Sequence, residues 1–275
     1  RLCGRISARV REVVSGHIEK QIPSGMEMAV SMMRLDKLLT EMGEGTRQEV
    51  KKLIRKGQVS VNGTIVKIPD QKVNEQTATI RCQGRNVCYE PVVYYMMHKP
   101  AGVVSATEDK KEKTVLDLLE RPVRTGVFPV GRLDKDTEGL LLLTNDGGLS
   151  HRLLSPKKHV DKTYEAVIDG IVGDEDVILF SRGVDIGDDT LTLPAVLKIL
   201  EVDREKLRSE IAITIQEGRY HQIKRMFQAV GKEVRYLKRI RMGSLILDPQ
   251  LKKGEVRRLT EEEIARLKGS SDKGD

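Results

Sequence analysis

The stretch from Gly131 to Gly147 constrains the fold more than any other part of the chain. It contains a loop rich in charged residues, an uninterrupted apolar run from Leu140 to Leu143, and a turn that ends at Gly147. A short apolar run bounded by glycines predicts a core strand. The charged loop, which carries Asp134 and Asp136, is therefore expected at the mouth of that strand, where a fold can present reactive side chains.

Length and composition limit the class of protein. The 275 residues suffice for one large or two ordinary domains with a substantial core. Aromatic residues make up only 3% and Trp is absent, so aliphatic side chains must supply most of the packing. The net charge of +7 favours a polyanionic partner. No apolar run approaches the roughly 18–20 residues needed to span a bilayer, and we therefore expect a soluble protein without membrane contact.

Cysteine and histidine usage predicts neither a metal site nor a disulfide framework. Cys3, Cys82 and Cys88 form no Cys-x-x-Cys pair, and the five histidines are scattered. This spacing does not match a zinc site, so no metal is expected. An odd number of cysteines without metal spacing suits a reducing compartment, and we expect a cytoplasmic protein.

We expect four segments along the chain. Residues 1–32 have little apolar periodicity and are interpreted as a disordered extension. Residues 33–90 and 91–268 are the two expected domains, and residues 269–275 are expected to be a frayed tail.

The first expected domain begins with two helices. Leu35, Leu38, Leu39 and Met42 share one helical face. Thr46 and Glu49 then form a capping box that opens a second helix. A two-residue turn at Asn62-Gly63 predicts a hairpin, and a further strand is expected from Ala78 to Cys82.

The sequence of residues 34–85 resembles that of the small RNA-binding domain of the fourth small-subunit ribosomal protein. This domain is known as the alpha-L motif. In that family a basic helix and the following turn grip the RNA backbone. Contacts of this kind give affinity and salt dependence rather than sequence reading. The resemblance implies that six cations bind RNA: Arg34, Arg47, Lys51, Lys52, Arg55 and Lys56. From composition alone, however, such a basic face is also typical of a solvated surface.

The second expected domain mixes strands and helices. Strands are predicted over 92–97, 162–167, 193–200 and 210–215, in addition to the central run at Leu140. Helices are predicted over 114–119, 149–154, 221–230 and 260–267. The predicted class is thus α+β: a small α-α-β domain followed by a domain with a mixed sheet.

The sequence GRLDKDTEGLLLLTNDG closely resembles the signature of pseudouridine synthases, in the branch that modifies ribosomal RNA and is named after the small-subunit enzyme. In that family the aspartate after Gly-Arg-Leu is catalytic, and here it is Asp134. Local spacing alone does not separate Asp134 from Asp136 or Asp146. The resemblance implies a largely antiparallel sheet with the active cleft across its middle.

Other parts of the chain match further motifs of this family. Lys162-Thr163-Tyr164 resembles the motif whose Tyr stacks on the target base, which implies a catalytic role for Tyr164. Gln222-Ile223-Lys224 resembles the motif in which a cation pairs with the catalytic carboxylate, so that Lys224 is expected beside Asp134. The residues Tyr-His before this motif are similar to those of the small-subunit enzyme, whereas large-subunit relatives usually carry Asn-Arg at these positions.

Three further residues are expected to bind the substrate. Leu237 corresponds to an apolar family residue that lines the base pocket. Arg132 lies close enough in sequence to Asp134 to contact the phosphate of a flipped nucleotide. Lys99 belongs to His98-Lys99-Pro100-Ala101-Gly102, which resembles a family motif whose usual Asn is replaced by His98.

The resemblance therefore implies an enzyme that isomerises one uridine of small-subunit ribosomal RNA. The reaction is redox-neutral, so no cofactor is expected. The expected partner is ribosomal RNA or an assembly intermediate, and the expected state is a monomer. A large-subunit uridine is the alternative substrate. A non-catalytic RNA-binding or ribosome-assembly factor is the alternative class, and a DNA-binding protein is a weaker one because no helix-turn-helix pattern accompanies the 221–230 helix.

Overall fold

The structure is a computed structural model that describes residues 32–120 and 122–269, and these residues divide into two compact units. The first unit comprises residues 32–91 and 122–125 of this part, and the second comprises residues 92–120 and 126–269. Both units combine helices and strands, which confirms the predicted α+β class. The predicted extension, apart from Met32, and the predicted tail beyond Gly269 lie outside the described residues.

The first unit begins with a short strand and two helices, followed by a small sheet. A strand at Met32, β1, pairs with β4, and a four-stranded sheet with the order β3-β2-β5-β6 forms within the part of the chain that is described. The elements are β1 (Met32–Arg34), α2 (Leu35–Glu41), α3 (Arg47–Arg55), β2 (Val59–Val61), β3 (Thr64–Ile65), β4 (Lys72–Asn74), β5 (Ile80–Cys82) and β6 (Arg85–Val87).

Two local predictions for this unit are confirmed. The hydroxyl of Thr46 accepts a hydrogen bond from the Glu49 N–H at 3.4 Å, and the Glu49 carboxylate accepts one from the Thr46 N–H at 2.8 Å. This capping box satisfies free N–H groups at the start of α3. Asn62 and Gly63 both have positive φ, at 51° and 83°, as a two-residue hairpin turn between β2 and β3 requires.

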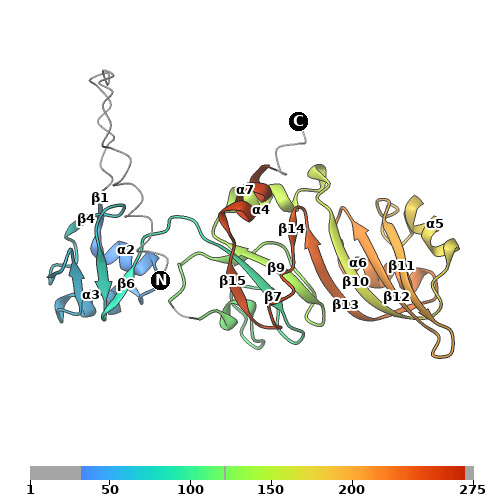
Figure 1. Ribbon diagram of the computed structural model, residues 1–275, viewed down its shortest axis with the longest axis horizontal. Helices are drawn as coiled ribbons and strands as arrows, with labels where there is room; N and C mark the ends of the chain where they lie inside the picture. The colour runs from blue at the N-terminus through green and yellow to red at the C-terminus, as the bar shows by residue number, and fades with distance from the viewer. Residues whose placement is uncertain (1–31, 121, 270–275) are drawn as a thin grey trace, which may run out of the picture. The chain divides into compact units, whose positions relative to one another are not determined.

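The second unit is built on a sheet with the order β11-β12-β10-β13-β9-β7-β15 among the described residues (Figure 1). The pairs along this order are antiparallel, except that β13 and β9 run parallel. Its strands are β7 (Tyr94–Lys99), β8 (Phe128–Pro129), β9 (Glu138–Thr144), β10 (Lys162–Asp169), β11 (Val196–Asp203), β12 (Arg208–Ile215), β13 (Glu233–Met242), β14 (Leu245–Ile246) and β15 (Val256–Arg258).

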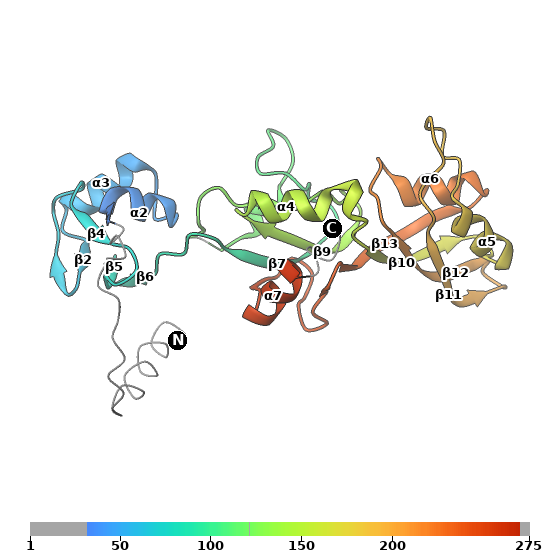
Figure 2. The same cartoon turned by 90° about the horizontal axis from the view of Figure 1, so that it is seen from above.

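Helices cover the sheet at both ends, as Figure 2 shows from above. At the β11–β12 end, α5 and α6 pack on apolar side chains of β10, β12 and β13, and Phe180 meets Phe227 edge to face with ring centroids 5.0 Å apart. At the β7–β9 end, α4 and α7 share a second core with Leu140 and Leu142. The helices are η1 (Val115–Leu118), α4 (Gly147–Leu154), η2 (Pro156–Lys158), α5 (Asp174–Arg182), α6 (Gln222–Ala229) and α7 (Glu261–Gly269).

The predicted core strand is confirmed as β9, in which all residues from Glu138 to Thr144 are buried. Other predicted boundaries differ. The strand expected over 92–97 spans Tyr94–Lys99, and the strand expected over 193–200 begins only at Val196. Helix α5 and strand β13 were not predicted. No helix within the described ranges is long and apolar enough to cross a membrane.

Candidate active site

Asp134 lies in the loop that connects β8 to β9, and neighbouring residues hold the backbone of this loop. The hydroxyl of Ser105 accepts a hydrogen bond from the Leu133 N–H at 3.1 Å and donates one to the Leu133 carbonyl at 2.9 Å. The carbonyl of Asp134 accepts a hydrogen bond from the Thr137 N–H at 3.1 Å, which closes a turn. The Asp134 carboxylate, about one third exposed, is therefore carried on a fixed backbone.

Lys99 lies beneath this loop, with its side chain fully buried. Its ammonium group donates to four backbone carbonyls, those of Pro100 at 3.1 Å, Asp134 at 3.0 Å, Lys135 at 3.3 Å and Thr137 at 2.8 Å. Burial lowers the pKa of Lys99 to about 8, an effect that the charges of Asp136, Asp134 and Glu138 partly offset.

The position of Lys99 does not support its predicted contact with substrate. A side chain with 0% exposure cannot touch a molecule in the pocket, and its ammonium already binds the loop carbonyls. Lys99 instead donates hydrogen bonds to carbonyl groups under the loop and so holds the loop backbone in place.

A pocket opens beside Asp134 and brings together five of the six residues that we predicted for catalysis or substrate binding. The absent one is Lys99. The lining residues come from the β8–β9 loop, β10, β12, the loop between β12 and α6, α6 and β13: Arg132, Leu133, Asp134, Thr137, Tyr164, Ile215, Gly218, Arg219, His221, Gln222, Ile223, Lys224 and Leu237.

Tyr164 and Leu237 form part of the wall of this pocket. Each is only 7% exposed, and they lie on the neighbouring strands β10 and β13. Ala166 pairs with Leu237 and Tyr164 pairs with Arg239, so these side chains project from the same face of the sheet. An aromatic ring and an aliphatic side chain thus offer apolar surface within reach of a carboxylate.

Lys224 lies in the first turn of α6 and faces two carboxylates. Its Nζ is 3.4 Å from Oδ2 of Asp134, as the prediction required, but only 2.7 and 2.8 Å from the two oxygens of Asp136. Burial raises the pKa of Asp136, but the hydrogen bond and charge of Lys224 outweigh this effect and lower it overall. Lys224 is therefore shared, and its closer partner is Asp136.

His221 is a second basic group beside Asp134, and its role was not predicted. Its Nε2 lies 3.5 Å from Oδ1 of Asp134. The residue precedes α6 with φ 48° and ψ 34°, a left-handed conformation that is uncommon for a non-glycine residue. The sequence predicted His221 only as a polar residue at the start of a helix. Its left-handed backbone conformation, which turns the side chain toward Asp134, is not indicated by any local sequence pattern.

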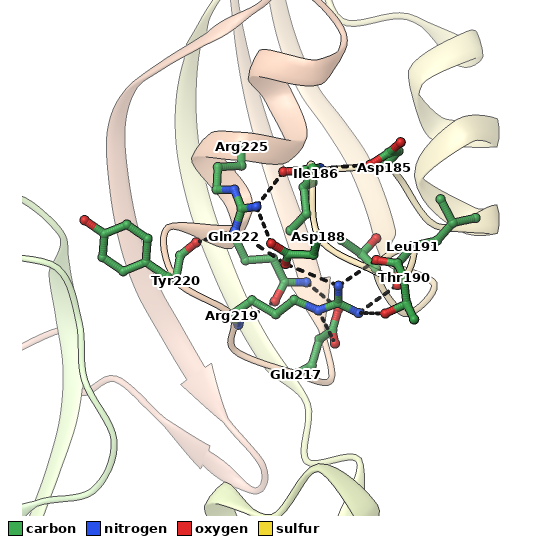
Figure 3. A network of polar contacts seen from close by, with 12 residues as sticks. Asp185, Ile186, Asp188, Thr190, Leu191, Glu217, Arg219, Tyr220, Gln222 and Arg225 are labelled. Atoms are coloured by element: carbon green, nitrogen blue, oxygen red, sulfur yellow. Dashed lines mark hydrogen bonds and ion pairs between the residues drawn. The ribbon is translucent and has the colours of Figure 1, made fainter.

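Arg219 and Arg225 bind a different segment, the one that follows α5 (Figure 3). Both guanidinium groups contact Asp188, and Arg219 also donates to the carbonyls of Thr190 at 2.8 Å and Leu191 at 2.7 Å. The hydrogen bonds and positive charges of Arg225 and Arg219 lower the pKa of Asp188. Neither arginine is therefore positioned as the partner of Asp134, although Arg219 lines the pocket.

The six predicted RNA-binding cations all lie in the first unit, but one differs from the rest. Arg34 forms a two-pronged ion pair with Asp36, at 3.0 and 2.8 Å. Five others form no ion pair within the described chain, and all but the half-buried Lys51 are exposed: Arg47, Lys51, Lys52, Arg55 and Lys56. This second group presents positive charge along α3.

Among the described residues, no three His, Cys, Asp or Glu side chains are grouped in a way that could hold a metal ion.

Comparison with known proteins agrees with this geometry. The family described as RNA pseudouridylate synthase matches residues 93–229, and the S4 domain matches residues 33–77. The uncharacterized RNA pseudouridine synthase YtzG of Bacillus subtilis is 50% identical over 84% of this chain and 97% of its own length. The chain belongs to the RNA pseudouridylate synthase family.

Other members of the family differ in the ribosomal subunit that their names give. Ribosomal small subunit pseudouridine synthase A of Vibrio cholerae is 42% identical, covering 86% of this chain and 99% of its own length. Ribosomal large subunit pseudouridine synthase B of Bacillus subtilis is 40% identical, with 88% and 98% covered. A solved pseudouridylate synthase structure has a TM-score of 0.59 at 37% identity, with 86% and 99% covered. This pseudouridine synthase thus combines an S4 domain with a catalytic domain.

Proposed function

We propose that this pseudouridine synthase isomerises one uridine of small-subunit ribosomal RNA, with Asp134 as the catalytic carboxylate. The observation that carries the proposal is the pocket in which Asp134 faces Lys224 and His221 beside an aromatic wall. The reaction breaks the bond between N1 of uracil and the ribose C1′, turns the base, and joins C5 to C1′. The proton on C5 is released and N1 gains one, so atoms and charge balance without a redox cofactor.

Asp134 acts as the nucleophile, toward either the base or the sugar carbon. The ammonium of Lys224, 3.4 Å from Oδ2 of Asp134, places a positive charge beside this nucleophile. His221 adds a second group that can be charged, and its Nε2 is within reach of the other carboxylate oxygen.

The target base has to leave its stack to reach Asp134. The ring of Tyr164 then supplies a face against which the uracil stacks, and Leu237 closes the side of the pocket. Stacking on an aromatic side chain contributes about 1–3 kcal/mol per base. Arg132, which is exposed at the pocket, is suited to the phosphate of the flipped nucleotide.

The S4 domain supplies the grip on the RNA backbone. The positive face of α3 is suited to phosphate groups, whose binding depends on salt but not on sequence. We infer that the enzyme acts as a monomer in the cytoplasm, on ribosomal RNA or an assembly intermediate.

Small-subunit RNA is preferred as the substrate because the Vibrio cholerae relative named for that subunit is 42% identical, compared with 40% for the relative named for the large subunit. The deciding experiment maps pseudouridine in both ribosomal RNAs from cells with and without this gene. Loss of one site in the small-subunit RNA is expected. Loss of a site in the large-subunit RNA instead would establish the alternative substrate, and no loss in either RNA would favour a non-catalytic RNA-binding or assembly factor.

A further inference from the structure

Tyr220 is the one exposed aromatic side chain among the nine of this chain, all of which lie in the described residues. It is 76% exposed. Its ring stacks on the imidazole of His221, with centroids 3.9 Å apart and planes inclined by 17°. One face of the Tyr220 ring is thus covered by His221, while the ring as a whole stays open to solvent.

The stacked pair lies at the rim of the active-site pocket. His221 lines the pocket and approaches Asp134 within 3.5 Å, whereas Tyr220 is outside the lining and projects away from the helix start (Figure 3). The two rings therefore lead outward from the catalytic carboxylate to the surface.

The turn that carries Tyr220 is held in place from behind. The carbonyl of Tyr220 accepts a hydrogen bond from Arg225 at 3.2 Å, and Arg225 is bound in turn to Asp188 and to the carbonyl of Ile186. The same turn contains His221 in its left-handed conformation, which costs free energy for a non-glycine residue. Hydrogen bonds thus fix this turn in a strained conformation in which the ring of Tyr220 is exposed. The ring is therefore preorganised for contact with a binding partner rather than for burial in the core.

We propose that Tyr220 is a stacking platform for the base next to the target uridine, and that it selects substrates in which this neighbour is unpaired. This inference rests on the proposed function. A flat aromatic ring binds any unstacked base through its π-face, so its partner is a single-stranded nucleotide of the same RNA. Arg132, exposed at the same pocket, is available for the phosphate between the two nucleotides. Tyr220 is thus a binding and specificity residue and not a catalytic one.

The first test compares Tyr220→Phe and Tyr220→Ala in single-turnover pseudouridine formation on small-subunit ribosomal RNA. Loss of one stacked base predicts that Tyr220→Ala needs about 5- to 150-fold more RNA for half-maximal rate, with the rate at saturation nearly unchanged. Tyr220→Phe keeps the ring and should match the wild type. Val196→Ala, at a comparably exposed position on β11, is the matched control.

The second test uses fluorescence, because the chain contains no Trp and Tyr220→Trp creates a unique probe. A short RNA that carries the mapped uridine should quench this probe. An abasic site at one of the two neighbours of the uridine should abolish the quenching, whereas an abasic site at the other should not. Val196→Trp should show no quenching with any of these RNAs.

Two results would overturn the inference. One is that Tyr220→Ala matches the wild type at every RNA concentration, and the other is that neither abasic site changes the quenching of Tyr220→Trp. Both leave the proposed function intact as long as the wild-type protein forms pseudouridine. If the wild-type protein forms none, the proposed function fails and the inference fails with it.

Discussion

The ammonium of Lys224 makes its closest ion pair with Asp136, at 2.7 and 2.8 Å, and not with the catalytic candidate Asp134. Asp136 is largely exposed, whereas Asp134 is only 30% exposed and lines the pocket. The ion pair with Asp136 therefore holds the ammonium of Lys224 where it also faces Asp134. Asp136 positions the cation, and Asp134 lies within reach of its positive charge.

We predict that Lys224→Arg is tolerated far better than Lys224→Met. Arg keeps a positive charge near Asp134, and Met removes it, although both side chains have similar length. Single-turnover rates of the Met variant should fall by about 10- to 100-fold, whereas those of the Arg variant should stay within about tenfold of the wild type. A wild-type rate in Lys224→Met would mean that Lys224 does not act on Asp134.

Replacing Lys99 should affect the stability of the catalytic domain. Lys99→Met removes a charged hydrogen-bond donor from four loop carbonyls, including those of Asp134 and Thr137, and should cost about 2–5 kcal/mol in the free energy of unfolding. Denaturant unfolding measures this loss. A Lys99→Met variant of unchanged stability but weakened RNA affinity would show that Lys99 reaches the substrate after all.

The ion pair between Arg34 and Asp36 predicts a dependence of stability on pH in the S4 domain. The hydrogen bond from Arg34 lowers the pKa of Asp36 in the folded state, so the stabilisation is complete above the unfolded pKa near 4 and is lost as the pH falls below it. Arg34→Met should therefore lower the midpoint of thermal unfolding at pH 7 and hardly change it at pH 2. Equal destabilisation at both pH values, measured by thermal unfolding, would contradict this account of the pair.

The basic face of α3 should contribute affinity and not chemistry. Replacing Lys51, Lys52 and Arg55 with Ala should weaken RNA binding. It should also reduce the magnitude of the slope of log affinity against log salt concentration by about 2–3. Saturating RNA should restore most of the catalytic rate. Arg34→Met is the matched control, since Asp36 already neutralises that cation, and a triple variant with an unchanged salt slope would show that α3 is only a solvated surface.

Local patterns predicted the parts of the fold that depend on neighbouring residues. The Leu140–Leu143 run is the buried core of β9, and the Thr46–Glu49 capping box opens α3. Long-range pairing was harder to predict. Register shifts where β10 pairs with β13 mean that no single alternation relates the two strands, and exposed Ile178 and Leu179 blur the apolar face of α5.

The same distinction explains the outcome at the site. The family motifs predicted which residues meet in the pocket, including Asp134, Tyr164 and Lys224. They did not predict what each side chain binds. Lys99 is buried and binds backbone carbonyls because the loop after β8 folds over it. Its hydrogen bond to the Asp134 carbonyl joins residues about 35 positions apart, which local patterns do not predict. The closer pairing of Lys224 with Asp136 likewise depends on how α6 packs against that loop.

We propose that Asp134, and not its neighbour Asp136, performs the chemistry. This assignment can be tested by single-turnover pseudouridine formation on small-subunit ribosomal RNA by the wild type, Asp134→Asn and Asp136→Asn, with mass spectrometry to exclude deamidation. We predict that Asp134→Asn loses at least about a thousandfold in rate while it still folds and binds RNA, because an amide keeps the shape but not the nucleophile. Asp136→Asn should stay within about tenfold of the wild type, because it leaves the nucleophile in place. Turnover by Asp134→Asn at the wild-type rate, or an equal loss in Asp136→Asn, would contradict the account.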